Sequence, residues 1–212
     1  MKTADLINAL AAEPPAPPLR LGRRVTVALA LGAAISAVLF MTALGPRPDF
    51  DAAAHTMRFD LKFVDTLALL LPSALLAVRL LRPEARPGAL VAALVAPFVL
   101  LGGAVIAELV MTPADLWMTR LIGTNALHCL TLIPLMSIPP LAALIVAMRV
   151  GAPSHPALTG ALAGAAAAGV AATIYATNCT DDSPLFVASW YPLATLVVVA
   201  AGALAGRKWL QW

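Results

Sequence analysis

The sequence predicts an all-α, polytopic integral membrane protein with six transmembrane helices and both termini in the cytoplasm. Hydrophobic residues make up 61% of the 212 residues and charged residues only 12%, whereas soluble domains have about 25% charged residues. One water-soluble core cannot enclose so much apolar side chain. This composition excludes a soluble enzyme, a nucleic-acid-binding domain and a disordered chain. Two cysteines are too few for a disulfide-rich secreted scaffold.

Six apolar stretches meet the length of roughly 20 residues that a helix needs to cross about 30 Å of hydrocarbon. They are Val25–Leu44, Phe63–Leu81, Ala89–Met111, Ala126–Met148, Ala157–Ala176 and Trp190–Ala205. Three prolines predict that the fourth is broken. The fifth is rich in Ala and Gly and is expected to pack closely on its neighbours. The sixth is the shortest, and aromatic residues at its ends suit a membrane interface.

The connections between the stretches contain weaker helix patterns. The segment 45–62 has mixed charge and is compatible with a short interfacial helix after Pro48. In the segment 112–125, Thr112 and Pro113 are typical of a helix cap followed by the first helical residue. Apolar residues after them would let that helix lie on the membrane interface.

The distribution of basic residues predicts the orientation. With a cytoplasmic N-terminus, ten of the 14 lysines and arginines lie inside and four outside. The ten are Lys2, Arg20, Arg23, Arg24, Arg79, Arg82, Arg86, Arg149, Arg207 and Lys208, and the four are Arg47, Arg58, Lys62 and Arg120. The positive-inside rule therefore favours a cytoplasmic tail (1–24), a membrane domain (25–206) and a cytoplasmic C-terminus (207–212). The expected location is a bacterial inner membrane.

The N-terminal tail combines a short apolar helix face with a stiff spacer. Leu6, Ile7 and Leu10 share one face of a helix that Thr3 or Asp5 would cap, and four prolines follow. So short a helix is unstable alone and would be ordered by docking into a groove on a partner. The alternative is a disordered tail whose charges only set the topology.

The two cysteines are the main candidates for chemistry. Cys129 lies at the outer end of the fourth stretch and Cys179 just beyond the outer end of the fifth, so antiparallel packing would bring them together. Three readings stay open: a metal- or oxidant-responsive pair helped by His128, a constitutive disulfide, or inert buried thiols. A zinc site from both cysteines, His128 and Asp181 has no recognised ligand spacing. No CxxC motif is present.

Glu108 is the one acidic residue deep in an apolar stretch. Acids inside a membrane are candidates for function, and with the proline-broken fourth stretch Glu108 supports a second hypothesis, a small transporter or channel. The simpler reading is that Glu108 reaches the interface or pairs with Arg120.

Taken together, these parts resemble the NrsF-type anti-sigma factors. The resemblance rests on D-L-I-x-x-L before six spans, a cysteine starting the fourth span, and C-T-D-D-S-P-L-F (179–186) followed by Trp190 and Tyr191. It implies an inner-membrane protein, not an enzyme, that holds an extracytoplasmic-function sigma factor inactive.

The resemblance also implies roles for residues. The sigma factor would bind Asp5, Leu6, Ile7 and Leu10 of the tail. Cys129 and Cys179 would sense heavy metal or oxidative stress, with His128, Asp181 and Asp182 as supporting residues. We expect no resident cofactor, at most a heavy-metal ion held transiently by the cysteines, and no direct contact with nucleic acid. The oligomeric state stays open.

Overall fold

The computed structural model describes residues 3–4, 20–83 and 85–211. Every regular element in these residues is helical, which confirms the all-α class. Six stretches are long and apolar enough to cross a membrane, in agreement with the six predicted spans. The elements are α2 (Leu21–Ala43), α3 (Phe50–Ala53), α4 (Met57–Leu80), α5 (Leu90–Ala93), α6 (Ala96–Met111), the 3-10 helix η1 (Ala114–Leu116), α7 (Trp117–Ile122), α8 (Ala126–Met148), α9 (Pro156–Ala176) and α10 (Pro184–Trp209).

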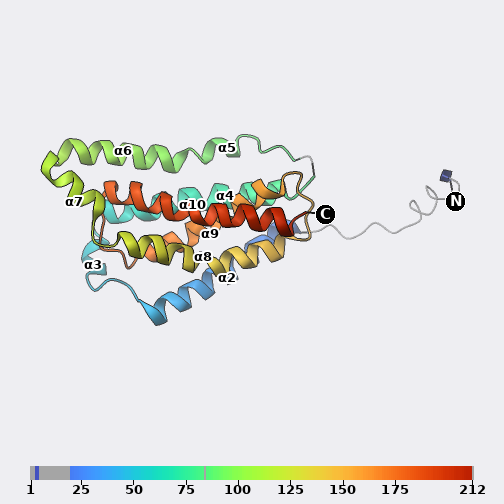
Figure 1. The fold of residues 1–212 in the computed structure, drawn as a ribbon, viewed down its shortest axis with the longest axis horizontal. Coiled ribbons are helices and arrows are strands. Elements are labelled where there is room, and N and C mark those ends of the chain that lie inside the picture. The colour runs from blue at the N-terminus through green and yellow to red at the C-terminus, as the bar shows by residue number, and fades with distance from the viewer. Residues whose placement is uncertain (1–2, 5–19, 84, 212) are drawn as a thin grey trace.

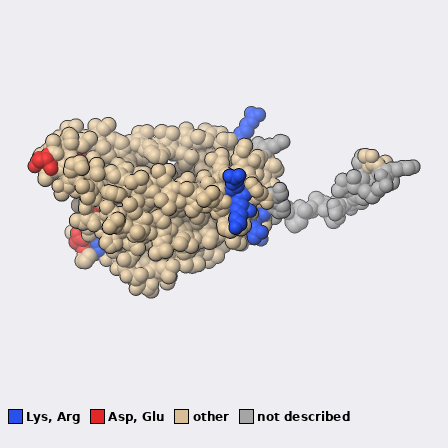
Figure 2. All heavy atoms as spheres, in the orientation of Figure 1, with Lys and Arg blue, Asp and Glu red and all other residues tan. Residues whose placement is uncertain are grey.

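The long helices form an elongated bundle whose two ends have separate apolar clusters. At one end, the basic end, the cluster includes Val25, Leu81, Met148, Leu162 and Leu210. At the other, the cysteine end, it includes Phe40, Cys129, Tyr175, Cys179 and Phe186. Figure 1 shows α9 in the middle of the bundle and α6 along one edge. Figure 2 shows basic side chains gathered at the end where the chain terminates and acidic ones at the opposite end.

Helix α9 owes its central position to small side chains. Its contacts with α10 run through Gly160 and Gly164 on one helix and Gly202 and Gly206 on the other. A Cβ atom on Gly160 would collide with the backbone carbonyl of Gly202. Such small residues let two backbones approach closely in a membrane, where lipid provides no hydrophobic drive for association. The expectation of close packing from the Ala- and Gly-rich fifth stretch is therefore correct.

The prediction that α8 is broken is wrong. The helix is continuous from Ala126 to Met148 although it contains Pro134, Pro139 and Pro140. A proline leaves the carbonyl four residues before it without its helical donor. The hydroxyl of Ser36 on α2 donates a 2.7 Å hydrogen bond to the carbonyl of Met136, four residues before Pro140. A neighbouring helix thus compensates for one proline, as is usual in membrane helices.

The sixth span is longer than expected. Helix α10 starts at Pro184, six residues before the predicted start, and its 26 residues make it the longest described helix. The Ser183 hydroxyl accepts a hydrogen bond from the amide of Leu185 at 3.3 Å and caps the helix. Tyr191 is 3% exposed and belongs to the core. Of the aromatic residues that suggested an interface, Tyr191 therefore lies inside the bundle, whereas Trp209 at the other end of the helix is 49% exposed.

The other helix bounds differ from the sequence expectation mostly at their starts. α2 begins at Leu21 and α4 at Met57, so each extends beyond its apolar stretch into polar residues. The short helix expected after Pro48 is present as α3. The expected cap at Thr112 is wrong, because Thr112 ends α6 and Pro113 precedes η1.

Candidate functional site

The cysteine end brings Cys129 and Cys179 into one apolar cluster. Cys129 lies in the first turn of α8, and Cys179 follows α9 with its amide bonded to the carbonyl of Tyr175 at 3.1 Å. Both side chains are 0% exposed, and both thiols are free. Tyr175 and Tyr191 complete this part of the cluster, with ring centroids 6.3 Å apart. Residues 50 positions apart in the sequence thus share one buried environment.

The two thiols are electrostatically different. Hydrogen bonding from the Cys129 thiol lowers the pKa of the Cys179 thiol to about 7, and the positive charge of Lys62 acts in the same direction. Burial works against this shift. Because the thiolate is the form that attacks oxidants and binds soft metals, Cys179 is the more reactive of the two at neutral pH once a reagent reaches it.

Two cations from elsewhere in the chain hold the segment that carries Cys179. The Lys62 ammonium, 0% exposed, donates to the Cys179 carbonyl at 2.9 Å and pairs with Asp182 at 2.5 Å. Arg47 pairs with the same carboxylate at 2.8 Å and with Asp49 at 2.7 Å. These acidic partners raise the pKa of Arg47 above its ordinary value. We call Arg47, Lys62 and Asp182 the clamp.

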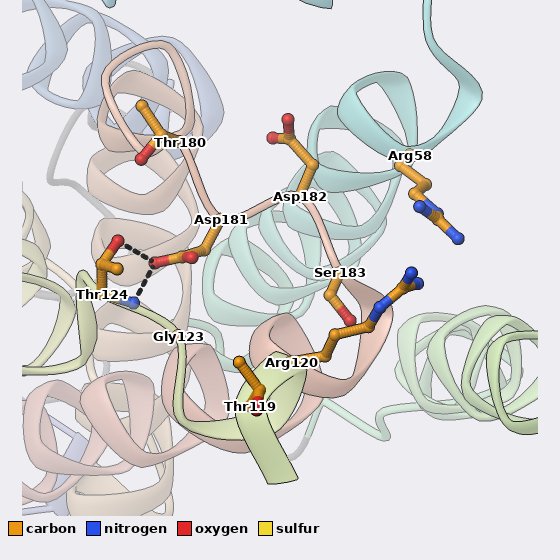
Figure 3. Close-up of a pocket in the computed structure, with 9 residues that line it drawn as sticks. All are labelled: Arg58, Thr119, Arg120, Gly123, Thr124, Thr180, Asp181, Asp182 and Ser183. Atoms are coloured by element: carbon orange, nitrogen blue, oxygen red, sulfur yellow. Dashed lines mark hydrogen bonds between the residues drawn. The ribbon is translucent and has the colours of Figure 1, made fainter. Parts of the chain in front are cut away.

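Asp181 attaches the same segment to the start of α8. Its carboxylate accepts hydrogen bonds from the amides of Thr124 and Asn125 at 2.9 and 2.8 Å. Figure 3 shows Asp181 turned toward Thr124, while Asp182 points to the other side of the segment. A carboxylate at a helix N-terminus satisfies free amides and complements the helix dipole. Asp181 and the clamp therefore hold residues 179–182 from two sides.

Glu108 forms a second ionic centre. Its side chain is 3% exposed, pairs with Arg58 of α4 at 2.7 Å and also pairs with Arg120 of α7. The simpler reading of Glu108 is thus correct. The two arginines line a cavity of about 340 Å³ together with residues 180–183 (Figure 3). Glu108 is paired with two cations, and α8 is a continuous helix, so neither feature supports the transporter hypothesis.

The remaining predicted site residues are not part of this arrangement. His128 is exposed on α8, although it is adjacent to Cys129 in the sequence. In the described part of the chain, no three His, Cys, Asp or Glu side chains are grouped so as to hold a metal ion. The tail residues Asp5, Leu6, Ile7 and Leu10 lie outside the described residues.

Comparison with known proteins identifies the family. The family model described as negative regulator of sigma F, NrsF, matches residues 10–212. The chain belongs to the NrsF family. It is 34% identical to the probable anti-sigma-F factor NrsF of Azospira oryzae and 33% identical to the anti-sigma-F factor NrsF of Caulobacter vibrioides, with all of each chain covered. No solved structure matches. The chain is accordingly an anti-sigma factor, as the resemblance implied, and the family is regulatory rather than enzymatic.

Sequence reasoning missed the clamp and treated its cations only as markers of topology. The distribution of basic residues in the sequence nevertheless contains a signal that indicates the clamp. The four basic residues that the charge asymmetry assigns to the cysteine end are exceptions to that asymmetry. All four make ion pairs in the structure: Arg47, Arg58, Lys62 and Arg120. An exceptional cation near an apolar segment is therefore a candidate for a buried ion pair.

Proposed function

We propose that this NrsF-family protein spans the bacterial inner membrane with its basic end in the cytoplasm and its cysteine end in the periplasm. Two observations support this orientation. The basic side chains gather at one end of the bundle (Figure 2), as the positive-inside rule requires for a cytoplasmic face. Each of the four cations at the other end pairs with a carboxylate, and the pairs share Asp49, Asp182 and Glu108. Most of their positive charge is thereby offset at the outer face.

The tail is the proposed binding element for an extracytoplasmic-function sigma factor. The apolar face of Leu6, Ile7 and Leu10, with Asp5 before it, is the chemistry of a short helix that docks into a groove. It lies on the side of the membrane where a sigma factor works. Docking also explains why so short a helix is useful, because the partner supplies the contacts that stabilise it.

A paired charge substitution tests the tail. The Leu6→Asp/Leu10→Asp variant is expected to lose the sigma factor in co-purification from membranes, because two charges enter the apolar face. The matched control is Asn8→Asp/Ala12→Asp, which adds the same charge on the opposite side of a helix with 3.6 residues per turn. Equal capture by both variants would exclude the tail as the binding element.

The second part of the proposal is that Cys129 and Cys179 sense thiol-reactive stress. The observation that carries it is the burial of both thiols in one cluster, with the pKa of Cys179 lowered to about 7. A peroxide oxidises the two thiols to one disulfide by accepting two electrons and the two thiol protons. Hydrogen peroxide is thereby reduced to two molecules of water, and an organic hydroperoxide to an alcohol and one molecule of water. With a soft divalent cation, both thiols release their protons and bind the metal as thiolates.

Either reaction would alter the contacts that hold residues 179–182. Forming a bond at Cys179 moves the segment whose carbonyl Lys62 binds and whose Asp181 attaches to α8. The change would pass along α8 and α9 to the basic end and weaken the hold on the sigma factor. A tenfold loss of affinity requires only about 1.4 kcal/mol of preference for the reacted state.

The Cys129→Ser/Cys179→Ser variant tests sensing. We expect repression of the sigma-dependent promoter to remain and induction by cadmium or peroxide to disappear. His128→Ala is the control, because it alters an exposed residue beside Cys129 and is expected to leave both properties intact. Normal induction in the double variant would refute sensing by the cysteines while leaving tail binding unaffected.

A further inference from the structure

A cavity between α4, α6, α9 and α10 contains a carboxylate that the site described above does not use. The cavity has a volume of about 230 Å³, and most of its lining is apolar, including Leu69, Leu101 and Val199. Asp65 of α4 lines it and is 8% exposed. Its Oδ1 atom is buried with no hydrogen-bond partner among the described residues.

The cations nearest to Asp65 in the sequence of α4 are committed elsewhere. Lys62 binds Asp182 and the carbonyl of Cys179. Arg58 pairs with Glu108. No ion pair of Asp65 occurs in the described part of the chain. Buried polar groups in proteins are almost always satisfied, and an acid within a membrane helix marks a functional site by default. Among the described residues, Asp65 therefore differs from the other buried charges, Arg47, Lys62 and Glu108, each of which has an ionic partner.

Two of the residues that line the cavity are exposed on the outside of the bundle. They are Phe98 of α6 and Leu196 of α10, which are 67% and 61% exposed. Both belong to stretches apolar enough to cross a membrane, so a ligand would enter from the lipid. Such a ligand must be mostly apolar, and at Asp65 it must offer a positive charge or a hydrogen-bond donor.

We propose that this cavity binds a small lipophilic ammonium compound, whose apolar part fills the space between α6 and α10 and whose ammonium group pairs with Asp65. A primary ammonium group would give the Asp65 carboxylate both a positively charged partner and hydrogen-bond donors. A charge-assisted hydrogen bond in an apolar cavity is stronger than one in water. Apolar walls with one well-placed charged group are the usual form of a small-molecule site.

The site is adjacent to the cysteine cluster without being part of its chemistry. Leu101, Ala172 and Tyr191 belong both to the cavity wall and to the apolar cluster that holds Cys129 and Cys179. A ligand that displaces these side chains would act on the same end of the bundle as a reaction at the thiols. Binding itself requires neither the cysteines nor the tail, so it can be tested independently of the proposed function.

Binding is tested on the full chain in lipid nanodiscs by isothermal titration calorimetry, with empty nanodiscs subtracted. The probes are 4-phenylbutylamine and two neutral analogues, 4-phenylbutan-1-ol and 4-phenylbutan-2-one. We expect saturable binding of the amine at least tenfold tighter than of either analogue. Equal or tighter binding of the ketone would overturn the proposal and favour a protonated Asp65 that donates to a carbonyl.

Two variants and one control locate the binding. Asp65→Asn keeps the shape of the side chain and is expected to weaken amine binding at least tenfold, with alcohol binding changed less than threefold. Leu69→Trp fills the cavity and is expected to abolish binding of all three probes. Asp60→Asn, at an exposed position of the same helix, is the matched control. Amine binding by Asp65→Asn within threefold of the unmodified chain would overturn the proposal.

Discussion

Helices α9 and α6 both belong to stretches apolar enough to cross a membrane, but they are held in the bundle in opposite ways. In α9, 67% of the most apolar stretch is buried, whereas in the stretch of α5 and α6 the fraction is 11%. α9 makes close backbone contacts through Gly160 and Gly164. α6 has Gly102 and Gly103, but a Cβ atom on either would meet nothing within 4 Å. The same residue type is a packing element in one helix and has no neighbour in the other.

The difference shows that hydropathy identifies the segments apolar enough to cross a membrane but does not determine how each is held in the bundle. α9 is positioned by shape along much of its length. α6 is attached by a polar group near its end, Glu108, which pairs with Arg58 and Arg120. Nearer its start, α6 lines the cavity that contains Asp65. Changes of shape should therefore affect α9 most, and changes of charge should affect α6 most.

The largest effect is expected from Gly160→Ala. The added methyl group meets the backbone of Gly202 and Gly206, which cannot move away as a flexible side chain would. Overpacking of this kind costs about 3 kcal/mol, and α9 and α10 must separate to accommodate it. The measurement is thermal unfolding of the full chain in detergent, followed by tryptophan fluorescence.

Gly102→Ala is the matched control, because it makes the same substitution on α6 where nothing lies within 4 Å. Its stability is expected to be unchanged or slightly higher, since alanine favours helix over glycine by about 1 kcal/mol. Equal destabilisation by the two substitutions would contradict the contrast between the helices.

A smaller effect is expected from Glu108→Gln, which removes the charge that attaches α6 to α4 and α7. The loss is about 1–2 kcal/mol, because Arg58 and Arg120 are partly exposed and water can solvate them once the pair is broken. We expect a lower Tm and faster proteolysis in the connection between α6 and α7.

Asp115→Asn is the control for this charge change, because Asp115 is exposed in the same connection. It is expected to leave Tm unchanged. If Glu108→Gln also left Tm and proteolysis unchanged, the ion pairs would not be what holds α6, and its attachment would have to come from its apolar contacts.

The sequence was sufficient for features that depend on composition and local pattern. Length and hydropathy predicted the all-helical class and six apolar helices. The place of Glu108 near a helix end suggested that it reaches the interface or pairs with Arg120, and the structure shows the pairing. The sequence was not sufficient where a partner is distant in the chain. The continuity of α8 at Pro140 involves Ser36 of α2, and the clamp joins Arg47 and Lys62 to Asp182. No local pattern contains those pairings.

The smallest effect, and the most specific to the candidate site, concerns the pH at which Cys179 reacts. Hydrogen bonding from Cys129 is the main cause of the lowered pKa of Cys179. In the Cys129→Ala variant that hydrogen bond is lost, so the pKa of Cys179 must rise from about 7 toward the ordinary value of a thiol. The midpoint of its reaction with iodoacetamide is therefore expected to move to higher pH, as mass spectrometry of the Cys179 peptide would record.

A control variant and the separate readouts of rate and midpoint distinguish a changed pKa of Cys179 from changed access to it. Ser137→Ala removes a buried hydroxyl from α8 that donates to the carbonyl of Ile133 in its own helix, and it is expected to leave the midpoint near pH 7. Changes of access alter the maximal rate in both variants, whereas only a changed pKa moves the midpoint. A midpoint that stays near pH 7 in Cys129→Ala would mean that Lys62, whose charge also lowers the pKa, keeps Cys179 reactive without its partner. The two thiols would then not act as a pair, and the first step of the proposed sensing would belong to Cys179 alone.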